Sequence, residues 1–298
     1  MSKREAILRY GLIIKKLRKH SATFKEISDF LAFESELHAY NFNISKRTFH
    51  RDIDDIRVIY NIDIQYDMSL KVYFIDYEEK GDANQRLIEA FDTLNAFSFL
   101  DNYSRYISFE KRNSQGTENL HGLLHAIKNS LNIKFIYKKY WENEQSLRKC
   151  EPLALKEFKN RWYLIAKDIK DDIIKSFALD RIHNIEITNK HFTPPRNFDV
   201  NEYYKYTFGI IGSHGKKPEE IILSFNLIQG KYIKSLPLHE TQKIITDTEE
   251  KLDISLKLVI TYDFIMEILS FGENVKVIKP ANLINEMKNI YINCLKQY

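Results

Sequence analysis

Residues 160–164 read NRWYL, a run in which an arginine stands beside two aromatic side chains. Aromatic faces stack on nucleic-acid bases, and nearby cations hold phosphate groups, so the run could hold a planar, anionic ligand. Strand alternation would place Arg161 and Tyr163 on one face and Trp162 with Leu164 on the other. The tripeptide therefore cannot all line one surface. The alternative interpretation is a buried strand in which Trp162 anchors the core.

A second group of candidate residues opens the segment 46–60, KRTFHRDIDDIRVIY. Apolar residues recur every three or four positions from Phe49 to Tyr60, which predicts a helix with one buried face. Ser45 can cap its start. Arginine can bind guanine edges or phosphates, with help from hydroxyl and imidazole groups. The outward side chains that could contact DNA in this way are Lys46, Arg47, Thr48, His50 and Arg51.

The surrounding elements would place this helix third in a small domain. Residues 3–20 have the spacing of an amphipathic helix, and Thr23 with Glu26 forms a capping box for a second helix. Two alternating runs, 62–67 and 70–77, flank a short turn and predict a hairpin. Three helices and a hairpin are typical of a winged helix-turn-helix, whose third helix enters the DNA major groove by its N-terminal end.

The placement of charge favours the same interpretation. Residues 1–51 hold eleven Lys/Arg and five Asp/Glu, a net +6, whereas residues 52–80 hold three and eight, a net −5. A helix with a basic start suits end-on contact with the negative charge of duplex DNA. An ordinary solvated helix is the alternative, with Arg51 paired to Asp54 or Asp55. The outward face of the first helix contributes Arg9, Lys15, Lys16, Arg18 and Lys19.

Beyond residue 80 the pattern changes twice. Helical spacing over 83–111 predicts a connecting helix or helical pair, followed by a polar break. A short helix at 120–130 then leads into four or five strand-like runs up to residue 188, which suggest a small barrel. From 219 onwards the expected order is β-α-β-β-α-β with a closing helix, as in a ferredoxin-like fold, with Asp263 capping the second helix.

Several of these motifs together resemble one family. Residues 120–200, with FIYKKY, EPLAL, RWYLIA and KSFALDRIHNIEIT, look like a WYL domain, an Sm/SH3-like barrel. The helix at 46–60 resembles the recognition helix that often precedes this domain, and residues 218–298 resemble the WCX extension that follows it. The resemblance implies a bacterial transcription regulator that senses nucleotides or short single-stranded nucleic acid. Carried over by position, the ligand-binding candidates are Tyr137, Arg161, Trp162, Tyr163, Lys175, Phe177 and Arg181.

The chain departs from the family pattern at two places. Lys175 stands where the family has arginine, and lysine offers a point charge in place of a bidentate fork. The stretch AFESELHAYNFN, residues 32–43, predicts a longer connection before the recognition helix than the family has.

Other chemistry was sought and not found in the sequence. Residues 208–218 fail the phosphate-loop spacing and are interpreted as a flexible linker. His121 and His125 stand at metal-ligand spacing without a third ligand. Neither a catalytic cluster nor a cofactor motif emerges, so we expect no cofactor, no metal and no enzyme. Two distant cysteines, an N-terminus that mixes charged with apolar residues, and the lack of a long apolar run predict a cytoplasmic protein that does not enter membranes.

The sequence therefore predicts a multidomain α+β protein. We expect a winged helix at 1–80, a helical linker at 81–119, an Sm/SH3-like WYL barrel at 120–207 and a ferredoxin-like dimerisation or effector domain at 208–298. The expected function is a ligand-responsive transcription regulator, a repressor that binds operator DNA as a homodimer and senses a small anionic or nucleic-acid ligand. The alternative is a non-regulatory protein that binds single-stranded DNA or RNA through the barrel.

Overall fold

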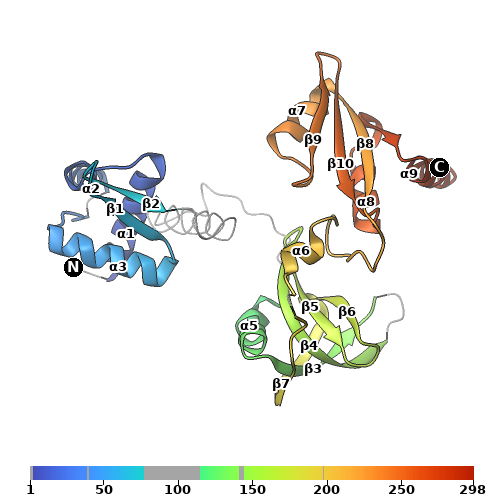
Figure 1. The fold of residues 1–298 in the computed structure, drawn as a ribbon, viewed down its shortest axis with the longest axis horizontal. Coiled ribbons are helices and arrows are strands. Elements are labelled where there is room, and N and C mark those ends of the chain that lie inside the picture. The colour runs from blue at the N-terminus through green and yellow to red at the C-terminus, as the bar shows by residue number, and fades with distance from the viewer. Residues whose placement is uncertain (1–2, 39, 77–114, 141–143, 197) are drawn as a thin grey trace. The chain divides into compact units, whose positions relative to one another are not determined.

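The computed structural model divides the chain into two compact units, Met1–Glu110 and Lys111–Tyr298 (Figure 1). The described residues are 3–38, 40–76, 115–140, 144–196 and 198–298. Most of the predicted helical linker, up to residue 114, lies outside these ranges. Each unit is described by itself below.

The described part of the first unit contains three helices and one hairpin, in the order that the sequence predicts. The helices are α1 (Lys3–Lys19), α2 (Phe24–His38) and α3 (Lys46–Tyr60), and the strands are β1 (Asp63–Asp67) and β2 (Val72–Asp76). β1 pairs antiparallel with β2, and Ala22 forms an antiparallel bridge to Tyr73 on the other edge of β2. The hairpin is thereby hydrogen-bonded to the chain between α1 and α2.

Local signals in the sequence account for where these helices begin. The Thr23 amide donates to the Glu26 carboxylate at 2.7 Å and the Glu26 amide donates to Thr23 Oγ1 at 3.2 Å, which confirms the capping box. Ser45 caps α3 by accepting the Thr48 amide at 3.2 Å. The stretch 32–43 is not the long connection that we expected, because α2 continues through its first half to His38.

The core of this unit buries the apolar stripe of α3. Phe49, Ile53 and Ile56 are buried and Tyr60 packs at the edge of the cluster, together with apolar residues of α1, α2 and the hairpin. Burying side chains of this kind stabilises a fold by about 1.5–3 kcal/mol each. The packing fixes α3 so that its opposite face meets solvent.

Arg9 does not lie on the basic surface of α1, contrary to the prediction. Its side chain is fully buried, where Nε donates to Asp52 Oδ2 at 2.7 Å and Nη2 donates to Asp52 Oδ1 at 2.9 Å. Sequence periodicity cannot show this, because the partner lies 43 residues away on α3. The two charged groups form a bidentate pair that joins α1 to α3 inside the core.

The second unit opens with a five-stranded antiparallel sheet. α5 (Leu120–Lys128) follows a 3-10 turn, η2 (Thr117–Asn119), and precedes the sheet; η3 (Leu179–Arg181) joins the last two strands. Spatial order is β6-β5-β4-β3-β7, and no pairing among the described strands joins β6 to β7, so hydrogen bonds do not close a barrel. The strands are β3 (Leu131–Lys138), β4 (Gln145–Phe158), β5 (Arg161–Asp168), β6 (Ile173–Ala178) and β7 (Ile182–His191).

The two faces of β5 pack into different clusters. Leu164 and Ala166 lie in the main core of the sheet, with Trp162 half-buried against it. Tyr163 and Ile165 lie in a smaller cluster that includes Ala178 and Tyr204. The predicted alternation of NRWYL and the residues after it is therefore confirmed.

The C-terminal part of this unit follows the expected order of elements. A short helix, α6 (Val200–Tyr204), precedes it, and its sheet has the order β11-β8-β10-β9 with antiparallel neighbours. The elements are β8 (Glu219–Asn226), α7 (Leu227–Ser235), β9 (Lys243–Asp247), β10 (Lys251–Leu258), α8 (Tyr262–Ser270), η4 (Gly272–Asn274), β11 (Val275–Lys279) and α9 (Ala281–Leu295). Thr261, and not Asp263, caps α8 by accepting the Phe264 amide at 3.4 Å.

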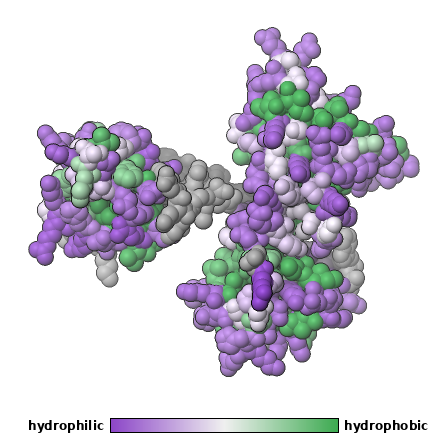
Figure 2. Space-filling view, in the orientation of Figure 1, coloured by the Kyte–Doolittle hydropathy of each residue, from purple (hydrophilic) through white to green (hydrophobic). Residues whose placement is uncertain are grey.

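Apolar side chains reach the surface of this C-terminal sheet domain. Figure 2 shows apolar surface over it, and the exposed residues include Ile228 and Leu236 on α7 and Ile244 and Ile245 on β9. β9 is an edge strand. Several exposed apolar side chains on one domain are typical of a region that another molecule covers.

The two cysteines differ in environment, and this predicts selective alkylation. Cys150 is fully buried, and burial raises the pKa of its thiol to about 12, whereas Cys294 is exposed near the C-terminus. Only a thiolate reacts readily, so iodoacetamide near pH 8 should modify the folded protein once, at Cys294. Mass spectrometry of tryptic peptides checks this. Denaturation should release the second site, and equal modification of both thiols in the folded state would contradict the burial of Cys150.

Candidate functional site

The five predicted DNA-binding residues lie at the start of α3, and three of them have roles inside the protein. Thr48 takes part in the cap, with its hydroxyl 3.1 Å from Ser45 Oγ. His50 Nε2 lies 3.2 Å from the Tyr73 hydroxyl of β2. The Lys46 ammonium lies 5.9 Å from the centre of the Phe24 ring. These contacts orient the first turns of α3 and leave Arg47 and Arg51 facing solvent.

Arg47 and Arg51 are exposed, one turn apart, and neither forms an ion pair with any residue in the described ranges. The carboxylates that could have neutralised Arg51 are engaged elsewhere. Asp54 pairs with Arg57 at 3.8 Å, and Asp55 accepts the Tyr10 hydroxyl at 2.6 Å. Two adjacent guanidinium groups are thus presented on the surface at the end of a helix. Such groups bind phosphate or guanine edges.

The hairpin beside α3 has the opposite charge. Residues 63–76 hold Asp63, Asp67 and Asp76 against a single lysine, Lys71. Asp67 shapes the turn by accepting the Ser69 amide at 2.7 Å and the Leu70 amide at 3.1 Å. The positive charge of this region is therefore concentrated at the start of α3, and the hairpin adds little attraction for phosphate.

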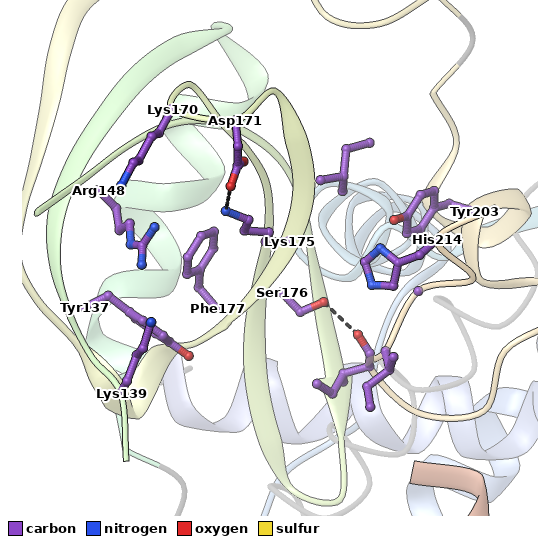
Figure 3. A pocket seen from close by; sticks show the side chains of 14 residues that line it. Tyr137, Lys139, Arg148, Lys170, Asp171, Lys175, Ser176, Phe177, Tyr203 and His214 are labelled. Carbon is purple, nitrogen blue, oxygen red and sulfur yellow. Dashed lines mark hydrogen bonds and ion pairs between the residues drawn. The ribbon is translucent and has the colours of Figure 1, made fainter. Parts of the chain in front are cut away.

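A pocket of about 610 Å³ lies along the edge strand β6 of the second unit. Lys175 and Phe177 lie on one side of β6 with the pocket residues of the sheet, and Ser176 lies on the other with Tyr203 and His214 (Figure 3). The lining residues are Tyr137, Lys139, Arg148, Lys170, Asp171, Ile174, Lys175, Ser176, Phe177, Tyr203, Ile210, Ile211, Gly212 and His214.

The sheet side of the pocket combines aromatic rings with cations. The rings of Tyr137 and Phe177 meet edge to face, with centroids 5.1 Å apart and an interplanar angle of 85°. Burial raises the pKa of Tyr137, although the charge of Arg181 opposes this, so the hydroxyl stays protonated near neutral pH. The cationic side chains around them, Lys139, Arg148, Lys170 and Lys175, give this side the composition of an anion-binding site.

A buried carboxylate holds two of these cations in place. Asp168, at the end of β5, is 1 % exposed, and its Oδ2 accepts from Arg148 Nη1 and from Lys175 Nζ, both at 2.9 Å. Its Oδ1 accepts the Lys170 amide at 3.1 Å. Burial alone would raise the pKa of Asp168, but the hydrogen bonds from Lys175, the Lys170 amide and Arg148 together lower it. Asp168 is therefore ionised and fixes both cations beside the pocket.

The other side of the pocket is formed by residues 205–218, which we call the connecting segment. The Ile210 carbonyl accepts the Ser176 hydroxyl at 2.7 Å and the Tyr204 hydroxyl at 3.3 Å. The amides of Ile210 and Ile211 donate to Asp263 Oδ2 of α8, at 2.9 and 3.2 Å. The segment is therefore hydrogen-bonded to β6 and to α8, and its first part is not the flexible linker that the sequence suggests.

Gly209 makes this connection possible. Its φ is +86°, and a Cβ at this position would lie 2.4 Å from Asp263 Oδ2. Only glycine combines a positive φ with so close an approach. Asp263, misinterpreted from sequence as a helix cap, instead attaches the pocket wall to the C-terminal sheet domain.

The structure brings together only part of the predicted ligand set. Tyr137, Lys175 and Phe177 line the pocket. Arg181 does not line it, but its guanidinium lies 5.2 Å from the centre of the Tyr137 ring and 4.9 Å from that of Tyr140.

The remaining predicted residues are Arg161, Trp162 and Tyr163, and none of them lines this pocket. Arg161 lies 3.6 Å from the Asp180 carboxylate and is exposed. Trp162 packs against the main core, and Tyr163 is buried in the smaller cluster. The aromatic residues of NRWYL thus contribute to packing on both sides of the sheet.

Eleven of the fourteen lining residues are absent from the predicted ligand set. Arg148 lies in the part of β4 that precedes the EPLAL motif, and Lys170 lies in the turn after β5. Tyr203 of α6 and His214 of the connecting segment approach β6 only in the folded chain, and no sequence signal shows this. Alternation along a longer β4 would have been enough to identify Arg148.

Two further features were sought in the described ranges. No group of three or more His, Cys, Asp or Glu residues there is arranged to hold a metal ion. Among the helices described, none has the length and apolar character needed to traverse a lipid bilayer.

Comparison with known proteins identifies two domains in the second unit. Residues 118–187 match the family model of the WYL domain, and residues 217–291 match that of the WCX domain. The pocket therefore lies on the WYL domain, and its far wall leads into the WCX domain. No curated protein matches the chain.

Solved structures give only distant similarity. Proteasome accessory factor B/C (PafBC) of Arthrobacter aurescens is 17 % identical with a TM-score of 0.33, and the match covers 96 % of this chain and 46 % of that one. This chain thus spans about half the length of that protein. A CRISPR Cas-related protein is 11 % identical with a TM-score of 0.37, over 98 % of this chain and 92 % of that one. By the family models alone, the chain contains a WYL and a WCX domain.

Proposed function

We propose that this protein is a ligand-responsive transcription regulator that binds duplex operator DNA through the start of α3. The observation that carries the proposal is the exposed pair Arg47 and Arg51, whose neighbouring carboxylates are bound to other partners. The order of three helices and a hairpin supports a winged helix, in which this end of the third helix enters the major groove. The WYL and WCX matches support a regulator of the WYL type.

The pocket beside β6 is the proposed ligand site. Four lysine and arginine side chains and two edge-to-face rings surround a volume that suits a small planar anion. A base can stack on aromatic rings while cations hold its phosphate. The ligand class is therefore a nucleotide or the end of a single-stranded nucleic acid. For the architecture, we propose an Sm/SH3-like WYL domain and a ferredoxin-like WCX domain.

We further propose that the regulator acts as a homodimer in the cytoplasm and represses its target. Helix-turn-helix dimers bind two half-sites about one helical turn apart, which increases affinity and specificity together. The exposed apolar side chains of β9 and α7 in the WCX domain offer a surface for a second copy. Sedimentation of the purified protein tests the dimer, and a reporter gene behind the bound promoter tests repression.

The experiment that tests the sensor combines duplex binding with a substitution at Lys175. Wild-type protein should shift DNA from upstream of its own gene in a gel assay, and AMP or a short oligothymidylate should change that shift. Lys175→Gln should keep the shift but lose the response, because the pocket loses a cation while α3 is unaltered. A response that survives Lys175→Gln would place the ligand elsewhere. Tight single-strand binding without any duplex specificity would instead identify a single-strand binding protein.

A further inference from the structure

Lys175 is bound by two carboxylates of different character. Asp168 is 1 % exposed and accepts from Lys175 at 2.9 Å. Asp171 is 39 % exposed, lines the pocket and also accepts from Lys175 (Figure 3). Lys175 therefore already has two carboxylate partners within the chain.

Asp168 cannot easily release Lys175 to another anion. It is almost completely buried, so removing Lys175 from it would take away one of the two cations, Lys175 and Arg148, that compensate its charge in the core. Lys175 is only partly buried, and burial would lower its pKa, but the hydrogen bonds that it donates to Asp171 and Asp168 raise it. The ammonium therefore stays charged and stays attached to Asp168.

Asp171 is the exchangeable partner. It stands in the turn between β5 and β6, where water screens its charge, and ion pairs at such positions contribute little to stability. Its other oxygen, Oδ1, accepts the Ile173 amide at 3.3 Å, so the side chain has a second partner within its own turn. Asp171 can thus leave Lys175 without being left unsatisfied.

We infer that Asp171 occupies the anion-binding position at Lys175 and that a ligand phosphate must displace it to bind. This inference rests on the proposed function of the pocket. Asp171 would then set the affinity of the sensor, because every ligand has to compete with an anion that is part of the chain. The bound phosphate would take the position of Asp171 Oδ2 while Asp168 keeps the ammonium in place.

The test is the affinity of two phosphate probes for matched variants of the full chain. Asp171→Asn removes the competing charge and retains a side-chain oxygen for the Ile173 amide. Asp172→Asn is the control, since it lies in the same turn and changes the net charge equally. Asp172 pairs outside the pocket, with Lys167 at 2.5 Å. AMP, measured by calorimetry, and a fluorescent oligothymidylate, measured by anisotropy, distinguish a free nucleotide from a single strand.

Asp171→Asn should tighten binding of the better probe by roughly fivefold, the equivalent of one exposed ion pair, with the gain shrinking at high salt. Asp172→Asn should change affinity by less than about twofold. Equal affinities for the two variants, with binding still lost in Lys175→Gln, would overturn the inference and leave the proposed sensor intact. If neither probe binds to wild type or to Asp171→Asn, the proposed sensor fails and the inference fails with it. Matching thermal unfolding curves verify that all variants are folded.

Discussion

Replacing Arg47 and Arg51 with alanine should abolish sequence-specific binding of duplex DNA. Each arginine is exposed, and neither has an ion-pair partner in the described ranges, so no internal contact is lost with it. Contacts of this kind contribute about 1–3 kcal/mol each, and the double variant should therefore lose at least roughly thirtyfold in affinity. Fluorescence anisotropy with the bound promoter fragment, repeated over a range of salt concentrations, measures the loss.

The salt dependence of DNA binding by the single variants also shows whether each arginine contacts a phosphate or a guanine. A phosphate contact weakens binding to all sequences and lowers the salt slope by about one, whereas a guanine contact relaxes specificity at one base pair. Arg57→Ala is the control on the same helix, because Arg57 is held by Asp63 at 2.7 Å and lies in the last turn. Undiminished binding by the double variant, or an equal loss with Arg57→Ala, would rule out the start of α3 as the contact surface.

Asp52→Ala should cost about 3–5 kcal/mol in the free energy of unfolding of the N-terminal unit, because it removes the carboxylate that pairs with the fully buried Arg9 guanidinium. Asp52 follows the exposed Arg51 in sequence and is itself buried, so the pair lies on the core side of α3. Chemical denaturation followed by circular dichroism measures the change. The double variant Arg9→Met with Asp52→Leu should recover much of the loss, since it removes both charges together.

An exposed ion pair of the same unit provides the comparison. Asp54 lies 3.8 Å from Arg57 with its own side chain 72 % exposed, and Asp54→Ala should cost less than about 1 kcal/mol. If Asp52→Ala were no more destabilising than Asp54→Ala, the buried pair would not be a main connection between α1 and α3. Loss of DNA binding in Asp52→Ala without loss of stability would be equally inconsistent with its place in the core.

The features predicted well from sequence are those with local causes. The capping box at Thr23, the Ser45 cap and the apolar stripe from Phe49 each depend on residues three or four positions apart. The alternation in β5 separates Leu164 from Tyr163 for the same reason. Spacing along one element determines which side chains share a face, and one chain is enough to show it.

The features missed from sequence depend on distant pairs. Arg9 was assigned to the surface because its partner Asp52 is on another helix. Asp263 was assigned to a cap because its partners, the amides of residues 210 and 211, lie more than fifty residues earlier. Neighbouring residues in the sequence do not show whether a charged residue at the border of a helix's apolar face is buried. The charge that compensates it can come from anywhere in the fold.

The attachment of the connecting segment to Asp263 bears on how such chains evolve. The WYL match ends at residue 187 and the WCX match begins at residue 217, a division that would let the two domains be exchanged separately. Yet Ile210 is bonded to Ser176 on one side and to Asp263 on the other, with Gly209 required in between. A recombination event at this boundary would have to exchange Ser176, Gly209 and Asp263 together. We therefore expect the two domains to be inherited as one piece.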